Sequence, residues 1–328
     1  MTWQEFGWRD REMPGEVLDE ATRREQGFPR TLRPVGGDDV RQQAIFDPSL
    51  KHWPRAYRAG DPVFADPART AAWAAARRAA MDAVLLAVAE SQWAGSLVLR
   101  GSVLLADWFG EEAREPGDLD FVVVPTSWVM TDGRTARMLD GIAAAAAGRG
   151  AGISAAGALC EDIWTYDRVP GRRMVLPWSV PGLPSGQVQL DFVFNEHLPA
   201  PPEPAELGCG AVVLAASPAL SLAWKLLWII SDGHPQGKDL YDAVLLAERY
   251  PLPYALLQEV FRMTGSWPLP NREVELQDFA DLNAGSVPGT EWPHFETEYP
   301  HLARAGEAAF VERLVEALAP TFTAGRQD

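Results

Sequence analysis

One stretch of the chain, residues 97–124, constrains the fold more than any other because it combines two apolar strands with a turn and two acidic residues. Its first apolar residues predict a short strand, which the pair Gly101 and Ser102 ends before the apolar start of a helix. A second strand then opens with Asp118 and Asp120. Because side chains alternate along a strand, both carboxylates share one face while their apolar neighbours point into a core.

These acidic side chains form a candidate metal site. Two carboxylates side by side at the start of a buried strand are costly unless a cation lies between them, and hard oxygen ligands suit Mg²⁺. A third candidate, Asp191, lies in the alternating segment 187–195, where the apolar side chains occupy the opposite face. A single acid on such a strand is more often a solvated residue. The pair Asp118 and Asp120 in another strand is what favours a shared site.

The turn at Gly101 and Ser102 is a candidate phosphate site. A glycine lets the backbone approach a ligand closely, and the amides at a helix start carry the positive end of the helix dipole. The Ser102 hydroxyl could add a hydrogen-bond donor. Alternatively, Gly101 only turns the chain and Ser102 caps the helix; the nearby aspartates favour the phosphate site.

A nearly apolar helix is predicted over residues 217–230, with Ser217 as its N-cap and Pro218 at its first position. Lys225 is the only charged residue in the middle of this helix. Such a lysine either extends along its aliphatic stem to water or faces an anionic group. The sequence leaves both interpretations open.

The segment Lys-Asp-Leu-Tyr-Asp at residues 238–242 leads into another predicted helix. Asp239 and Asp242 are three residues apart and therefore share one helical face. Acidic residues near a helix start are also explained by the helix dipole alone. The segment therefore predicts a helix start, with a functional role as the alternative.

The order of these segments resembles a known family. Arg-Gly-Ser, then Arg114 before Asp-Leu-Asp, a later strand aspartate, a helix with an internal lysine and Lys-Asp-Leu-Tyr-Asp are similar to the nucleotidyltransferase AbiEii/AbiGii toxin family. That family lies within the DNA-polymerase-beta-like nucleotidyltransferase superfamily. The likeness covers roughly residues 97–248. It implies an α/β (α+β) fold, with the polymerase-beta-like mixed sheet flanked by helices and a helical C-terminal region.

The resemblance also implies an activity, the transfer of a nucleoside monophosphate from a nucleoside triphosphate to a hydroxyl group. Two Mg²⁺ ions about 4 Å apart can stabilise the entering and leaving oxygens of such a transfer. By resemblance, Asp118, Asp120 and Asp191 bind Mg²⁺, and Asp191 helps to activate the acceptor hydroxyl. The residues implied to bind the nucleotide or support its site are Gly101, Ser102, Lys225, Lys238, Asp239 and Asp242.

Several acceptors and partners are compatible with this activity. Some members of the family modify the acceptor end of tRNA, so tRNA is the leading acceptor by analogy, and an antitoxin protein is a possible partner. One alternative is transfer to a hydroxyl of a small molecule or a protein. A second alternative is a catalytically silent protein that binds a nucleotide or a partner; the presence of all three acids argues against it.

Charge limits the surfaces available to nucleic acid. The net charge is −16, whereas a protein that grips many phosphates generally displays a basic face. Any such face must therefore be local. Solvated surface is the favoured interpretation of both candidate clusters, which are Arg134 with Arg137, and Arg168, Arg172 and Arg173 around a hairpin-like Val-Pro-Gly turn.

The expected location is cytoplasmic, without a membrane partner. No apolar run approaches the roughly 18 residues of a membrane span. The first ten residues lack a basic and then apolar signal pattern. Cys160 and Cys209 are isolated, which argues against a zinc site or a disulfide scaffold.

Three parts are expected along the chain. Residues 1–65 form an irregular N-terminal extension that packs on the core, because its scattered aromatic residues are untypical of disorder. Residues 66–215 form the nucleotidyltransferase domain, and residues 216–328 form a helical C-terminal domain. Further expected elements are helices at 67–90, 134–147 and 302–318, strands at 159–167, 173–178 and 187–194, and a loop at 267–300.

Overall fold

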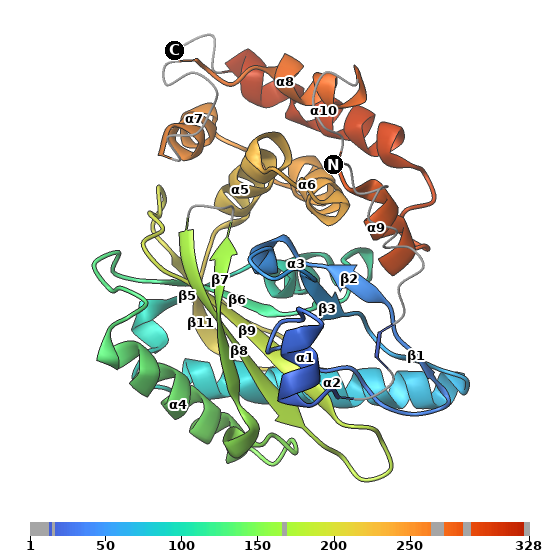
Figure 1. The fold of residues 1–328 in the computed structure, drawn as a ribbon. Helices are drawn as coiled ribbons and strands as arrows, with labels where there is room; N and C mark the ends of the chain where they lie inside the picture. The colour runs from blue at the N-terminus through green and yellow to red at the C-terminus, as the bar shows by residue number, and fades with distance from the viewer. Residues whose placement is uncertain (1–12, 15–16, 166–168, 264–271, 285–289, 325–328) are drawn as a thin grey trace. The chain divides into compact units, whose positions relative to one another are not determined.

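A computed structural model describes residues 13–14, 17–165, 169–263, 272–284 and 290–324 (Figure 1). The chain forms two compact units that do not follow chain order. The first unit contains Met1–Leu99, Gly117–Glu196 and Ala205–Val213, and the second contains Arg100–Pro116, His197–Pro204 and Leu214–Asp328.

A seven-stranded sheet has the strand order β10-β11-β5-β6-β9-β8-β7. Strand β6 runs parallel to β9, whereas β8 pairs antiparallel with both β9 and β7, so the sheet is mixed. The strands are β5 (Leu97–Arg100), β6 (Leu119–Val123), β7 (Leu159–Thr165), β8 (Val169–Trp178), β9 (Gly186–Val193), β10 (Glu203–Glu206) and β11 (Val212–Ala215).

Two helices of the first unit cover this sheet (Figure 1). Helix α2 (Pro67–Ala89) packs against β9 and against α4 (Gly133–Ala147). Asp66 caps α2 by accepting the Ala68 backbone amide at 2.9 Å, and Pro67 occupies the first turn, where a missing N–H costs nothing. Both helices lie within two residues of their predicted bounds.

The N-terminal segment contains short regular elements instead of wholly irregular backbone. These are α1 (Glu20–Glu25) and two small antiparallel sheets, β1 (Val40–Arg41) with β4 (Val63–Phe64) and β2 (Ala44–Phe46) with β3 (Tyr57–Ala59). A single turn of 3₁₀ helix, η3 (Pro48–Leu50), lies against β7. Leu50 and Ala56 pack there with Ile163, so apolar burial joins this segment to the sheet.

The second unit is largely helical. Helix α5 packs on α6, and α6 packs on α10 and α9. Its helices are α3 (Ser102–Phe109), α5 (Pro218–Ser231), α6 (Gly237–Arg249), α7 (Tyr254–Met263), α8 (Leu276–Ala280), α9 (Trp292–Glu298) and α10 (Glu307–Ala324).

The loop expected at 267–300 is wrong in part, because helices α8 and α9 lie within it. Another part of this range lies outside the described residues. Helices α8 and α9 are too short to show a helical period, and contacts between helices stabilise α9. Trp292 lies 5.1 Å from Phe310 of α10 and 4.9 Å from Phe295, measured between ring centroids. The closing helix, expected at 302–318, begins at Glu307 and reaches Ala324.

None of the helices in the described parts of the chain has both the length and the apolar character needed to cross a membrane.

Candidate active site

Three aspartates converge on two neighbouring strands, at the start of β6 and near the end of β9. One carboxylate oxygen each from Asp118, Asp120 and Asp191 lies within 4.8 Å of the others. Asp120 lies on β6 opposite Asp191 on β9, and Asp118 precedes Asp120 by two residues. Leu119, between the two acids of β6, is fully buried, as strand alternation requires. The structure therefore places all three predicted metal ligands in one cluster.

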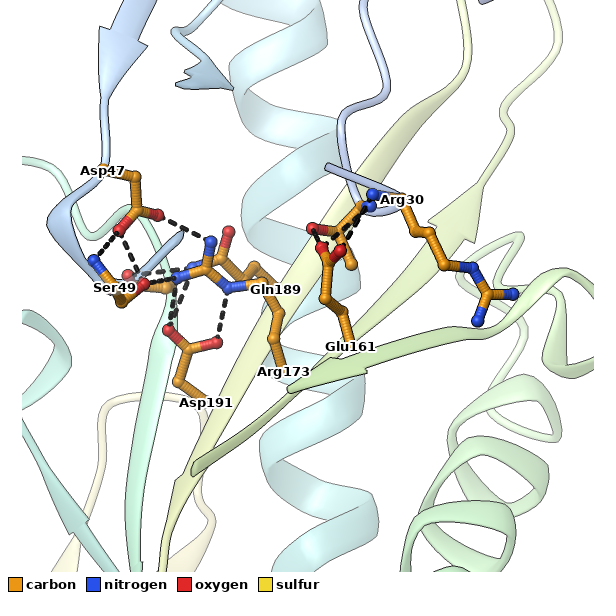
Figure 2. Close-up of polar contacts among 9 residues, drawn as sticks. Arg30, Asp47, Ser49, Glu161, Arg173, Gln189 and Asp191 are labelled. Atoms are coloured by element: carbon orange, nitrogen blue, oxygen red, sulfur yellow. Dashed lines mark hydrogen bonds and ion pairs between the residues drawn. The ribbon is translucent and has the colours of Figure 1, made fainter. Parts of the chain in front are cut away.

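Asp191 is also held by Arg173 of the adjacent strand β8, which lies opposite it in the antiparallel register (Figure 2). Arg173 Nε donates to Asp191 Oδ1 at 2.8 Å, and Arg173 Nη2 donates to Asp191 Oδ2 at 2.7 Å. This is the two-pronged geometry in which a guanidinium binds a carboxylate most specifically. Arg173 is 3% exposed and Asp191 is 6% exposed.

Burial and charge oppose each other at this pair. Burial raises the pKa of Asp191 most strongly, Arg173 lowers it, and the negative charge of Asp118 raises it, with a net increase. Burial lowers the pKa of Arg173, but Asp191 and Asp47 outweigh that effect and raise it well above its usual value. Crowded carboxylates of this kind are a donor set that suits a hard divalent cation.

An amide side chain links two of the acids. Gln189 Nε2 donates to Asp118 Oδ2 at 3.3 Å and to Asp191 Oδ2 at 3.2 Å. Its side chain shares a face of β9 with Asp191, because the two residues are two positions apart. A neutral donor between these carboxylates reduces their repulsion without adding a charge.

Gly101 and Ser102 occupy the start of helix α3, in the second unit. Gly101 is the N-cap, with φ +85° and ψ −153°, a backbone conformation that is essentially limited to glycine. Ser102 is therefore the first helical residue and does not act as the cap. Its side chain is 1% exposed, and its Oγ has no hydrogen-bond partner among the described residues.

Lys225 lies in a buried ion-pair network of the second unit. Its Nζ is 2.6 Å from Asp239 Oδ1 and 2.9 Å from Asp242 Oδ2. Arg114 donates to the same Asp242 carboxylate from Nε at 3.1 Å and from Nη2 at 3.0 Å. Lys225 is 4% exposed, so it does not extend to water and faces carboxylates of its own chain.

These contacts keep the network charged. Burial lowers the pKa of Lys225, but Asp239 and Asp242 raise it more, so the ammonium form is stabilised. Burial raises the pKa of Asp242, but Arg114 and Lys225 outweigh that effect and hold it below its usual value. Lys238, the second residue of α6, is half-buried, outside this set of contacts.

The role of Arg173 was not predicted from the sequence, where Arg173 was interpreted as a surface residue beside a turn. Residues 169–171 of that expected turn belong to strand β8. Arg168 lies outside the described residues. Arg172 pairs with Asp162 at 2.9 Å on the opposite face of β8. Strand alternation could have indicated this role, because Arg172 and Arg173 are adjacent and their side chains must point to opposite faces of the strand.

Similarity to known proteins agrees with this geometry. A mixed sheet flanked by helices, with three converging aspartates, has the features of a nucleotidyltransferase. The model of the nucleotidyl transferase AbiEii toxin family, of type IV toxin–antitoxin systems, matches residues 83–320. The chain belongs to this family and has the nucleotidyltransferase activity that defines it. The resemblance and the fold class expected from the sequence are thus confirmed.

Similar solved structures include the following two. JHP933 from Helicobacter pylori has a TM-score of 0.46 and 12% sequence identity, over 78% of this chain and 94% of that chain. MenT4, a nucleotidyltransferase toxin from Mycobacterium tuberculosis, has a TM-score of 0.44 and 18% identity, over 75% of this chain and 82% of that chain. No curated protein matches the chain.

Proposed function

We propose that this chain is a Mg²⁺-dependent toxin that transfers a nucleoside monophosphate from a nucleoside triphosphate to a hydroxyl acceptor. The observation that carries the proposal is the cluster of Asp118, Asp120 and Asp191, whose carboxylate oxygens lie within 4.8 Å of one another. Three carboxylates suffice for a pair of divalent ions because substrate phosphates and water supply the other ligands.

The donor set fits Mg²⁺ chemically. All three ligands are hard carboxylate oxygens, and the described cluster includes no cysteine or histidine that would favour a softer metal. When bound, the ions stabilise negative charge on the entering and leaving oxygens. Asp118, Asp120 and Asp191 are the residues proposed to hold them.

The proposed reaction is the transfer of a nucleotidyl group to the acceptor hydroxyl. The acceptor oxygen forms a bond to the α-phosphorus, the bond from this phosphorus to the bridging oxygen breaks, and pyrophosphate leaves. The acceptor hydroxyl loses its proton, and Asp191 is the residue proposed to assist that loss. Arg173 holds both oxygens of Asp191 and so fixes the direction of its carboxylate.

Nucleotide binding is proposed for the remaining candidates. Gly101 and Ser102 would contribute backbone amides and a hydroxyl at the start of α3, where anions are favoured. Lys238 would contact a phosphate, since it is outside the buried ion pairs. Lys225, Asp239 and Asp242 would support the nucleotide site through their network, because their charges are already paired with one another and with Arg114.

We propose tRNA as the acceptor, by analogy with the family, a cytoplasmic location, and an antitoxin as the partner of this type IV toxin. Purified protein is incubated with MgCl₂ and each labelled nucleoside triphosphate, together with total RNA, with a small-molecule extract or with a pool of proteins. Label in the tRNA fraction supports the proposal. Label found only in small molecules or only in proteins would assign one of the alternative acceptors. Absence of Mg²⁺-stimulated transfer with every triphosphate would contradict the proposed activity.

A further inference from the structure

We propose that Asp47 and Ser49 of the N-terminal segment position Asp191 for catalysis by holding Arg173 in place. Both residues precede the part of the chain that matches the family, which begins at residue 83. The inference rests on the proposed function, because it assigns a role around the same metal-binding acids. Asp47 and Ser49 are thus positioning residues and do not touch the reacting groups.

The guanidinium of Arg173 binds three partners (Figure 2). Nε and Nη2 bind Asp191, whereas Nη1 donates to Asp47 Oδ2 at 2.6 Å. Nη2 also donates to Ser49 Oγ at 3.1 Å. All three guanidinium nitrogens therefore have partners, and the plane of the group cannot rotate without breaking contacts on both sides.

Asp47 is held in place by contacts within its own segment as well as by Arg173. It caps the 3₁₀ turn η3, because its Oδ1 accepts the Ser49 amide at 3.1 Å and the Ser49 hydroxyl at 2.6 Å. Its own amide donates to the Ala56 carbonyl at 2.8 Å. The pKa of Asp47 lies below its usual range: burial raises it, but Arg173 and Ser49 outweigh that effect. Asp47 thus presents a rigid charge to Arg173.

This arrangement matters because Asp191 lies between a positive and a negative neighbour. Arg173 draws its carboxylate from one side, while Asp118 and Asp120 lie within 4.8 Å on the other. If Asp47 is removed, the buried guanidinium loses one of its two anionic partners and its orientation is no longer fixed. Residues that orient metal ligands are typically worth about 10–100-fold in metal affinity or activity.

The same N-terminal segment makes a second polar contact with the sheet that does not involve Arg173. Glu161 of β7 accepts the Arg30 amide at 3.0 Å and the Thr31 hydroxyl at 2.7 Å (Figure 2). Thr31, like Asp47, is nearly buried. Thr31→Val is therefore a matched control, since it weakens the docking of the segment and leaves the Arg173 contacts in place.

The test compares Asp47→Ala, Asp47→Asn, Ser49→Ala and Thr31→Val in the full chain. Mn²⁺ affinity is measured by calorimetry, kcat and KM by transfer of labelled nucleotide, and folding by thermal unfolding. We expect Asp47→Ala to lower Mn²⁺ affinity and kcat by about 10–100-fold at nearly unchanged KM for the triphosphate. Asp47→Asn should recover part of the loss, because its amide oxygen still accepts from Arg173, and Thr31→Val should leave both quantities unchanged.

Two outcomes overturn the inference. One is an effect of Asp47→Ala on Mn²⁺ affinity and kcat no larger than that of Thr31→Val; the other is an equal fall in all four variants. If Asp47→Ala does not fold, Ser49→Ala is used instead, and a smaller fall in Mn²⁺ affinity and kcat is expected for it.

Asp118→Asn distinguishes this inference from the proposed function. Loss of Mn²⁺ binding in Asp118→Asn, with normal Mn²⁺ binding in Asp47→Ala and Ser49→Ala, overturns only this inference. Normal binding in Asp118→Asn contradicts the proposed function itself.

Discussion

Asp120 and Asp191 lie directly opposite each other on the parallel strands β6 and β9. On its other side, Asp191 lies opposite Arg173 of the antiparallel strand β8. The register of three neighbouring strands therefore places Asp191 between an acidic cluster and a buried guanidinium. The chemistry proposed for the chain depends on this arrangement.

The buried network of Asp242 predicts a pH-dependent stability. Burial raises the pKa of Asp242, but Arg114 and Lys225 lower it below the unfolded value, which is about 4. The stabilisation is therefore fully present above about pH 4 and is lost as the pH falls through the folded pKa. Urea unfolding should show a difference between wild type and Asp242→Asn that is large at pH 7 and shrinks below pH 4. A difference that stays constant from pH 7 to pH 3 would contradict this account.

Lys225 should be important for stability as well as for the nucleotide site. Lys225→Met leaves Asp239 and Asp242 with fewer positive partners in a buried place, where loss of one partner costs about 3–5 kcal/mol. The control is Arg313→Ala, which breaks the exposed pair with Glu248 and should cost less than about 1 kcal/mol. Equal unfolding free energies for the two variants in urea titrations would show that the network is not stabilising.

Gly101 should not tolerate a side chain. Its φ of +85° and ψ of −153° fall in a region that costs other residues about 1–3 kcal/mol. Gly101→Ala is therefore expected to lower the unfolding temperature and to raise KM for the triphosphate. Gly95→Ala is the control: a Cβ there meets nothing within 4 Å, so its stability should change by less than about 0.5 kcal/mol. Wild-type stability and activity in Gly101→Ala would contradict the proposal that this turn binds phosphate.

Local patterns in the sequence predicted the elements that carry the acids. A helix was likewise expected at residues 67–90, where the structure has α2 (Pro67–Ala89), and Trp73 and Val84 of this helix are 5% and 0% exposed. Alternation along β6 and β9 put Asp120 and Asp191 on the faces opposite their apolar neighbours. Such features depend on residues a few positions apart, so one sequence is enough to infer them.

The features that the sequence did not predict depend on distant contacts. Asp47 and Arg173 are 126 residues apart, and the pairing of Arg173 with Asp191 requires the register of β8 on β9. The partners of Lys225 were likewise left open, because only the packing of α5 on α6 brings Asp239 and Asp242 to it. Burial of charge is a tertiary property, and the composition of a strand or helix does not determine its partner.

The central claim is that the three aspartates hold the ions on which nucleotide transfer depends. The most direct test is the transfer rate of Asp120→Asn with labelled triphosphate and Mg²⁺, beside Asp140→Asn, which changes an exposed acid of α4. We predict that Asp120→Asn loses transfer while it keeps the circular dichroism spectrum and the unfolding temperature of the wild type, and that Asp140→Asn stays active. Turnover by Asp120→Asn at a rate near that of Asp140→Asn would contradict the account.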